Sequence, residues 1–301
     1  MDDRAVSRYG PNQTLVGMGF VVLAYFLFSF HDAAIKWLVT GLSVWQVMVV
    51  RSATIVALSL AIGRGPLIAE AARSRAKRDY LILAVILVTA WQLYYAASRT
   101  LQLGELTTFY FTTPIIAIIL AQPMLGDRAG LVAWVAAGIG FAGVVVASRP
   151  GSVGLDGAVL MVVVASALWA LAQVLMRRLG RSERSERALI QMLYTNSGAL
   201  LASAVVAPFV WRAGPAADWL LLGSLGFLGG AAQFALIEGF RRASPGALAP
   251  FQYSALIWAV VLGYLIWNDV PDRAVMAGAA LIIVAGAMVI ADERRRRRQA
   301  R

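Results

Sequence analysis

Long apolar segments alternate with short polar ones along the whole chain. Each apolar segment is about 20 residues long, enough for a helix to cross a hydrocarbon core of roughly 30 Å. The segments do not alternate apolar and polar residues as the strands of a membrane barrel do. The pattern therefore predicts an all-α integral membrane protein with ten transmembrane helices. They are predicted at residues 15–38, 44–63, 79–99, 104–125, 130–148, 154–176, 187–209, 217–239, 246–267 and 272–291.

The ten segments divide into two sets of five. Positions about 141 residues apart match: Lys36 aligns with Arg177, and Gln92 aligns with Gln233. A repeat with an odd number of spans must be inverted relative to its copy, because each span crosses the bilayer once. The fold expected is therefore two inverted five-helix repeats. The predicted organisation is a cytoplasmic segment at 1–14, a first repeat at 15–148, a second repeat at 154–291 and a basic cytoplasmic tail at 292–301.

Loop charge supports the inversion. The loop after the second segment carries five basic residues, whereas the equivalent loop of the second copy carries only Arg212. When alternate loops and the two chain ends are counted together, 21 basic residues fall on one side of the membrane. The other side holds four, Arg99, Arg149, Arg212 and Arg273. Basic residues accumulate on the cytoplasmic side, so both termini are predicted to be cytoplasmic. Residues 64–78 and 178–187 should lie inside, and residues 149–153 and 210–216 outside.

The composition narrows the class of protein. The chain has 301 residues, of which 60% are hydrophobic and only 14% are charged, as expected for a protein solvated by lipid. The net charge of +11 lies mainly on one side of the membrane, so nucleic acid is not an expected partner. With no Cys, a single His and no paired carboxylates within a span, an enzyme is not expected. Neither a metal nor a cofactor is expected. The first apolar segment is too long for a cleaved signal core and should stay in the membrane.

A local motif carries a resemblance to a known family. The fourth segment contains Thr113-Pro114, and an acidic turn at Gly126-Asp127 leads into a glycine-containing fifth segment. Together with two five-helix repeats, this resembles the drug/metabolite transporter superfamily, EamA type. In the second copy Ser254-Ala255 replaces the proline, and neither copy has the glutamate usual at the acidic turn.

The resemblance implies a secondary transporter in the bacterial inner membrane, most similar to the exporters of aromatic and other amino acids. The implied function is export of small zwitterionic metabolites of broad specificity, by alternating access around a central aromatic-lined cavity. Transport of drugs, sugar phosphates or nucleotide-sugars by the same fold is the alternative, and an intramembrane enzyme or a channel is a distant one. The expected partners are the substrate and the lipid bilayer, with the protein a monomer or a weak homodimer.

Polar and aromatic residues in the middle of the spans are the candidate substrate contacts, because polar groups at that depth are costly without a use. Aromatic rings supply apolar and cation–π surface, and amides supply directional hydrogen bonds. A proline in a helix frees a backbone carbonyl for a ligand or a hydroxyl. Ordinary helix packing and a packing kink are the alternatives. The candidates are Trp91, Gln92, Tyr95, Tyr110, Pro114, Trp169, Gln173, Tyr253 and Trp258.

Three charged or titratable residues are candidates for coupling or for contact with a substrate carboxylate: His31, Asp32 and Arg51. One interpretation makes His31 or Asp32 a proton carrier. The favoured one pairs Asp32 with Lys36, four residues later on the same helix. Arg51 either pairs with a carboxylate of the protein or holds that of the substrate.

Overall fold

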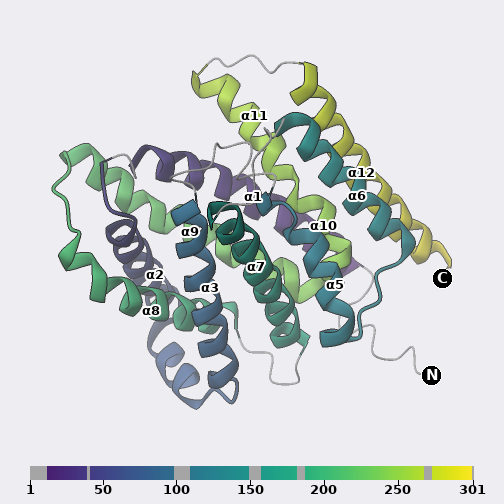
Figure 1. Ribbon diagram of the computed structural model, residues 1–301. Helices are drawn as coiled ribbons and strands as arrows, with labels where there is room; N and C mark the ends of the chain where they lie inside the picture. The colour runs from purple at the N-terminus through teal and green to yellow at the C-terminus, as the bar shows by residue number, and fades with distance from the viewer. Residues whose placement is uncertain are drawn as a thin grey trace.

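The computed structural model describes residues 12–38, 41–97, 109–148, 157–181, 187–267 and 273–299, and in these ranges every regular element is a helix (Figure 1). Seven helices of the described part are long and apolar enough to cross a membrane, and two further apolar helices, α5 and α6, are shorter. The helices are α1 (Asn12–Leu38), α2 (Val44–Arg73), α3 (Lys77–Ala97), α5 (Thr113–Leu125), α6 (Leu131–Ser148), α7 (Gly157–Arg181), α8 (Ala188–Val206), the short η2 (Ala207–Phe209), α9 (Ala216–Arg242), α10 (Pro245–Gln252), α11 (Ser254–Trp267) and α12 (Arg273–Gln299).

Two stretches predicted to be loop or tail are helical. Helix α2 continues to Arg73, ten residues beyond its predicted end at 63, and α12 continues through most of the basic tail to Gln299. The sequence around Arg64 does break α2, since Arg64 has a φ of 56° in the left-handed region. The helix resumes at once because Pro66 suits the first turn of a new helix, where no backbone N–H is needed.

The strongest helix–helix contacts come in related pairs. Helix α1 packs on α9 and α3 packs on α7, while α2 packs on α8 and α6 on α12. When each helix of the first repeat is matched with its counterpart in the second, the α1–α9 contact corresponds to the α7–α3 contact. The α2–α8 and α6–α12 contacts each join a helix to its own counterpart. In Figure 1, α6 and α12 lie side by side at one end of the bundle, and α2 and α8 lie at the other. The two halves of the chain are therefore packed against one another along the whole bundle.

Both halves break a helix at equivalent positions. A turn at Phe111 and Thr112 precedes α5, and Tyr253, 141 positions after Thr112, separates α10 from α11. Pro114, predicted to lie in the middle of a span, lies in the first turn of α5. Its missing N–H leaves the carbonyl of Tyr110 without the usual helical donor. The hydroxyl of Thr113 donates to that carbonyl at 2.6 Å, so the oxygen is satisfied within the protein.

Glycines set two of the closest helix contacts. A Cβ atom on Gly143 of α6 would lie 2.7 Å from the carbonyl oxygen of Gly278 on α12, so the two backbones pack directly. On α9, a Cβ atom on Gly229 would lie 3.0 Å from Nε of Arg51 and 3.1 Å from Cδ2 of His31. Small residues permit this approach in membrane helices. Gly229 thereby leaves room for two of the candidate polar residues.

Candidate functional site

Aromatic side chains from α3, α7 and the residues before α5 meet inside the bundle. The ring centroids of Trp91 and Trp169 are 6.4 Å apart, and those of Tyr94 and Tyr110 are 4.6 Å apart. Tyr95 packs edge-on against Tyr94, with centroids 5.7 Å apart. We call these five residues the central aromatic cluster. Four of them were candidate substrate contacts, and the structure brings them together from segments up to 78 positions apart in the chain.

Arg51 of α2 lies against this cluster. Its guanidinium carbon is 4.8 Å from the ring centroid of Trp91, a cation–π contact, and the side chain is only 3% exposed. Nε donates to Nε2 of His31 at 3.0 Å. The terminal amino groups of Arg51 have no hydrogen-bond partner among the described residues. A buried guanidinium with unused donors is well suited to bind a carboxylate, which can accept two parallel hydrogen bonds from it.

His31 joins Arg51 to Asp32. Because the Nε–H of Arg51 can only donate, Nε2 of His31 accepts, which leaves the imidazole neutral with its proton on Nδ1. That Nδ1 lies 3.1 Å from Oδ1 of Asp32, whose side chain is 68% exposed. The favoured partner of Asp32 from sequence was Lys36, whose side chain lies outside the described residues. The described partner of Asp32 is His31.

Gln92 presents an unused donor. Its amide nitrogen is buried and has no hydrogen-bond partner among the described residues. Leaving such a group unsatisfied costs about 1–3 kcal/mol, so a buried orphan amide calls for an explanation. Gln92 is adjacent in sequence to Trp91, on the helix that supplies most of the central aromatic cluster. The amide nitrogen of Gln92 is therefore a donor that a polar ligand next to these rings could use.

Gln173, in contrast, is satisfied within the protein. It exchanges two hydrogen bonds with Gln252, of 2.8 and 3.1 Å, and the hydroxyl of Tyr25 donates to the same Gln252 oxygen at 2.8 Å. This buried network ties α1, α7 and α10 together. Tyr25 and Trp169 belong to the same buried cluster, so the network adjoins the central aromatic cluster. Gln173 is thus arranged to position helices rather than to contact a ligand.

Tyr25 and Gln252 were not among the candidates. A signal for Tyr25 was present, because Tyr25, Phe28 and His31–Asp32 recur at helical spacing along one face of the first predicted helix. The rings of Phe28 and His31 do meet, with centroids 6.2 Å apart. Gln252 lies in a polar and aromatic run at residues 250–254, but this pattern could not reveal its partners, which are 79 and 227 positions away in the chain.

Two further candidates contact other neighbours. Tyr253 is fully buried with its ring 5.7 Å from that of Phe111, and Trp258 packs on Phe26 with centroids 4.8 Å apart. Neither ring has a member of the central aromatic cluster among its ring contacts in the described part of the chain. The Tyr253 hydroxyl and the Trp258 indole nitrogen are buried without a partner among the described residues. The structure therefore does not bring these two residues to Arg51 and Trp91.

A family comparison accounts for this architecture. The model of the EamA-like transporter family matches residues 15–149 and 156–291, nearly the whole chain. The chain belongs to the EamA-like transporter family. It is therefore a multi-pass membrane protein of the drug/metabolite transporter superfamily and a transporter, not an enzyme.

Individual EamA-like relatives transport different compounds. The S-adenosylmethionine uptake transporter of Rickettsia conorii is 26% identical over 274 residues, covering 89% of this chain and 90% of its own. The riboflavin transporter of Rhizobium johnstonii is 28% identical over 206 residues, 67% of this chain and 65% of its own. The pseudopaline exporter of Pseudomonas aeruginosa is 25% identical over 272 residues, 88% of this chain and 93% of its own. Both uptake and export are represented.

A solved crystal structure has the same fold. It superposes on this EamA-like protein with a TM-score of 0.74, covering 94% of this chain and 98% of its own at 19% sequence identity. At that identity the likeness concerns the fold alone.

Proposed function

We propose that this EamA-like transporter carries small zwitterionic metabolites, namely amino acids and their derivatives, including aromatic and apolar ones. The observation that carries the proposal is the buried Arg51, which is stacked on Trp91 and whose terminal amino groups have no hydrogen-bond partner in the described part of the chain. An arginine binds a carboxylate in two-point fashion, and the neighbouring rings accept an apolar or aromatic side chain. The relatives support this chemistry, since S-adenosylmethionine carries an amino-acid group and riboflavin carries a flat ring system.

In this proposal each residue of the site has its own role. Arg51 binds the substrate carboxylate, and Gln92 donates from its amide to the same end of the substrate. Asp32, exposed and held by His31, receives the substrate ammonium or the coupling proton. The rings of Trp91, Trp169, Tyr95 and Tyr110 contact the substrate side chain. Pro114, Gln173, Tyr253 and Trp258 shape the surrounding helices, as their internal contacts favour.

The proposed mechanism is alternating access between two inverted repeats, residues 15–148 and 154–291, with ten spans in all. The paired helix contacts support it, because two halves of equivalent structure can exchange conformations and expose the site to each side in turn. We propose a monomer or weak homodimer in the bacterial inner membrane, with residues 1–14 and the tail 292–301 in the cytoplasm. Net export is the proposed direction, supported by the pseudopaline exporter, and the uptake relatives make net uptake the competing result.

Counterflow in proteoliposomes tests the substrate class. Vesicles loaded with unlabelled tyrosine, leucine or methionine should accumulate the labelled compound, whereas vesicles loaded with a sugar phosphate or a hydrophobic cation should not. The expected difference is at least about tenfold in initial rate, because each 1.4 kcal/mol of lost interaction is tenfold. Export and uptake are then compared in vesicles of known orientation. Counterflow with sugar phosphates or drugs, and none with amino acids, would contradict the proposal.

Single cysteines test the proposed topology, since the chain contains no native Cys. Arg75→Cys lies in the turn between α2 and α3, and Trp211→Cys lies between η2 and α9; both positions are exposed. Because basic loops stay on the cytoplasmic side, position 75 should react with an impermeant maleimide only after cells are opened. Position 211 should react in intact cells. Labelling of position 75 in intact cells would overturn the topology.

A further inference from the structure

An apolar groove opens on the flank of the bundle, apart from the central aromatic cluster. It has a volume of about 980 Å³ and lies between α1, α2, α8 and α9. No residue of the central aromatic cluster lines it. Several of its apolar side chains are exposed, which places the groove on a surface that faces lipid in a membrane. Its apolar lining includes Phe20, Leu23, Leu58, Ile62, Phe227 and Phe234.

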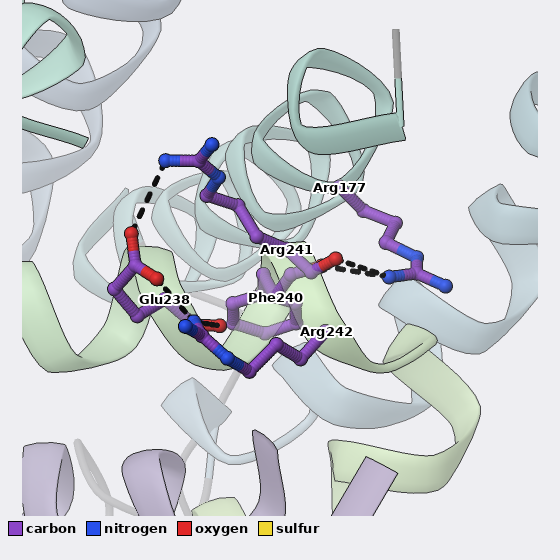
Figure 2. A network of polar contacts seen from close by, with 5 residues as sticks. All are labelled: Arg177, Glu238, Phe240, Arg241 and Arg242. Atoms are coloured by element: carbon purple, nitrogen blue, oxygen red, sulfur yellow. Dashed lines mark hydrogen bonds and ion pairs between the residues drawn. The ribbon is translucent and has the colours of Figure 1, made fainter. Parts of the chain in front are cut away.

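One end of the groove is charged. Arg187, Glu238 and Arg241 line it there. Figure 2 shows that Glu238 pairs with both Arg241, at 3.1 Å, and Arg242, so one carboxylate serves two guanidinium groups. Arg242 also lies over the ring of Phe20 at 4.9 Å, beside the apolar lining. This end of the groove therefore carries a surplus of positive charge.

Two further features add to the attraction for an anion. Arg187 pairs with Glu70 at 3.5 Å, but both side chains are nearly half exposed, which weakens that pair through solvent screening. Arg187 immediately precedes α8, whose first N–H groups also favour negative charge. Arg177 holds the end of α9 by donating to the carbonyls of Phe240 and Arg241, at 3.3 and 2.8 Å (Figure 2). The arginines at this end of the groove therefore lie at the C-terminal end of α9, which Arg177 holds in place.

The dimensions match one leaflet of a bilayer. Along α9 the groove runs from Phe227 to Arg241, about 21 Å at a rise of 1.5 Å per residue. Half of a hydrocarbon core is roughly 15 Å thick, and a headgroup layer lies beyond it. An acyl chain lying along the apolar lining would therefore place its headgroup at the arginines.

We propose that the groove binds a phospholipid with a net negative headgroup. One acyl chain lies along Leu23, Ile62 and Phe234, and the phosphate is held by Arg187, Arg241 and Arg242. The walls come from both halves of the chain, α1 and α2 on one side and α8 and α9 on the other. A bound lipid therefore bridges the two halves and stabilises this arrangement of the helices, as any ligand specific for one state does.

Binding of defined lipids to the full-length protein in detergent tests the proposal. Phosphatidylglycerol and phosphatidylcholine with identical acyl chains are titrated and bound lipid is counted by native mass spectrometry, with the melting temperature measured in parallel. We expect at least a tenfold preference for phosphatidylglycerol and a rise in melting temperature with that lipid. Arg187→Gln/Arg241→Gln should reduce the preference to about twofold or less. Ala231→Trp, which fills the groove from an exposed position of α9, should remove binding of both lipids.

Matched variants separate a site from a general effect of charge or bulk. Arg75→Gln removes one exposed positive charge elsewhere, and Ala142→Trp adds the same bulk to an exposed position of α6; both should behave as the wild type. Arg187→Gln alone serves if the double variant unfolds, since Arg187 is nearly half exposed. Equal binding of the two lipids, unchanged binding in the groove variants, or equal competition by a free fatty acid would each overturn the proposal. None of these results bears on the transport assay, which reports on the central site.

Discussion

Arg51→Gln should lower the transport of amino acids by about 100-fold or more. Arg51 is buried, and its terminal donors are unused in the described structure. Removing a charged hydrogen-bonding partner from a desolvated pair costs about 2–5 kcal/mol, and 2.7 kcal/mol corresponds to roughly 100-fold. Arg51→Lys should be intermediate, because an ammonium keeps the charge but cannot form the planar two-point contact.

The pattern across substrates distinguishes binding from folding. If Arg51 binds the carboxylate, the wild type should prefer tyrosine over tyramine, which lacks that group. Arg51→Gln should lose this preference because only the tyrosine rate falls steeply. Initial rates of counterflow for the two compounds provide the measurement.

Arg73→Gln is the matched control, since it removes one arginine from the exposed end of the same helix. It should transport as the wild type does. A folded Arg51→Gln protein in which tyrosine and tyramine transport fall by the same factor would assign Arg51 a packing role. The carboxylate site would then have to lie elsewhere in the bundle.

The long apolar segments were sufficient to predict an all-helical membrane protein but not every helix end. An apolar segment of about 20 residues strongly indicates a helix, because the backbone polar groups of a segment in lipid must be paired within the segment itself. The second segment was predicted to end at 63, and α2 is indeed broken at Arg64, but Gly63-Arg64-Gly65-Pro66 did not reveal that a further helical stretch follows to Arg73. The chain returns to a helical conformation after the break and stays helical to Arg73. The charged residues of this stretch are compatible with a helix that is exposed to water.

The candidate site was predictable in its composition and not in its geometry. Mid-span depth identified Trp91, Gln92 and Trp169 as residues that need an explanation. Whether an amide faces a ligand or another amide depends on contacts between distant segments. Gln173 pairs with Gln252 across 79 positions, whereas the amide nitrogen of Gln92 has no such partner among the described residues. Nothing in the local sequence of the two glutamines separates these outcomes.

The link between Arg51 and His31 illustrates the same limit. From sequence, each was a separate candidate, and Asp32 was assigned to Lys36 by helical spacing. The structure connects Asp32, His31 and Arg51 through two contacts of 3.1 and 3.0 Å, across α1 and α2, and the Lys36 side chain lies outside the described residues. This connection depends on Gly229 of α9, whose lack of a side chain leaves room for both groups. Only the packing of three helices reveals it.

Trp169→Ala should weaken the transport of bulky substrates far more than that of small ones. The ring of Trp169 is 94% buried and faces Trp91, which itself stacks on Arg51. If the two rings accept the substrate side chain, truncation removes apolar contact worth about 1–3 kcal/mol for a large side chain. The apparent affinity for tryptophan or phenylalanine should fall roughly 5- to 150-fold, and that for alanine or serine about twofold or less. Concentration dependence of counterflow gives the measurement.

Two variants isolate the contribution of the ring. Trp169→Phe keeps an aromatic surface but removes the indole N–H, so it should retain most of the preference for bulky substrates. Trp219→Ala removes an exposed indole that stacks on Trp211 at the edge of the bundle, and it should leave every substrate unchanged. Melting temperatures must be compared first, because a cavity in the core destabilises the helices. A stable Trp169→Ala protein that loses affinity equally for alanine and tryptophan would show that this ring only packs. If the ring contacted the substrate, its loss would reduce the affinity for a large side chain more than the affinity for a small one.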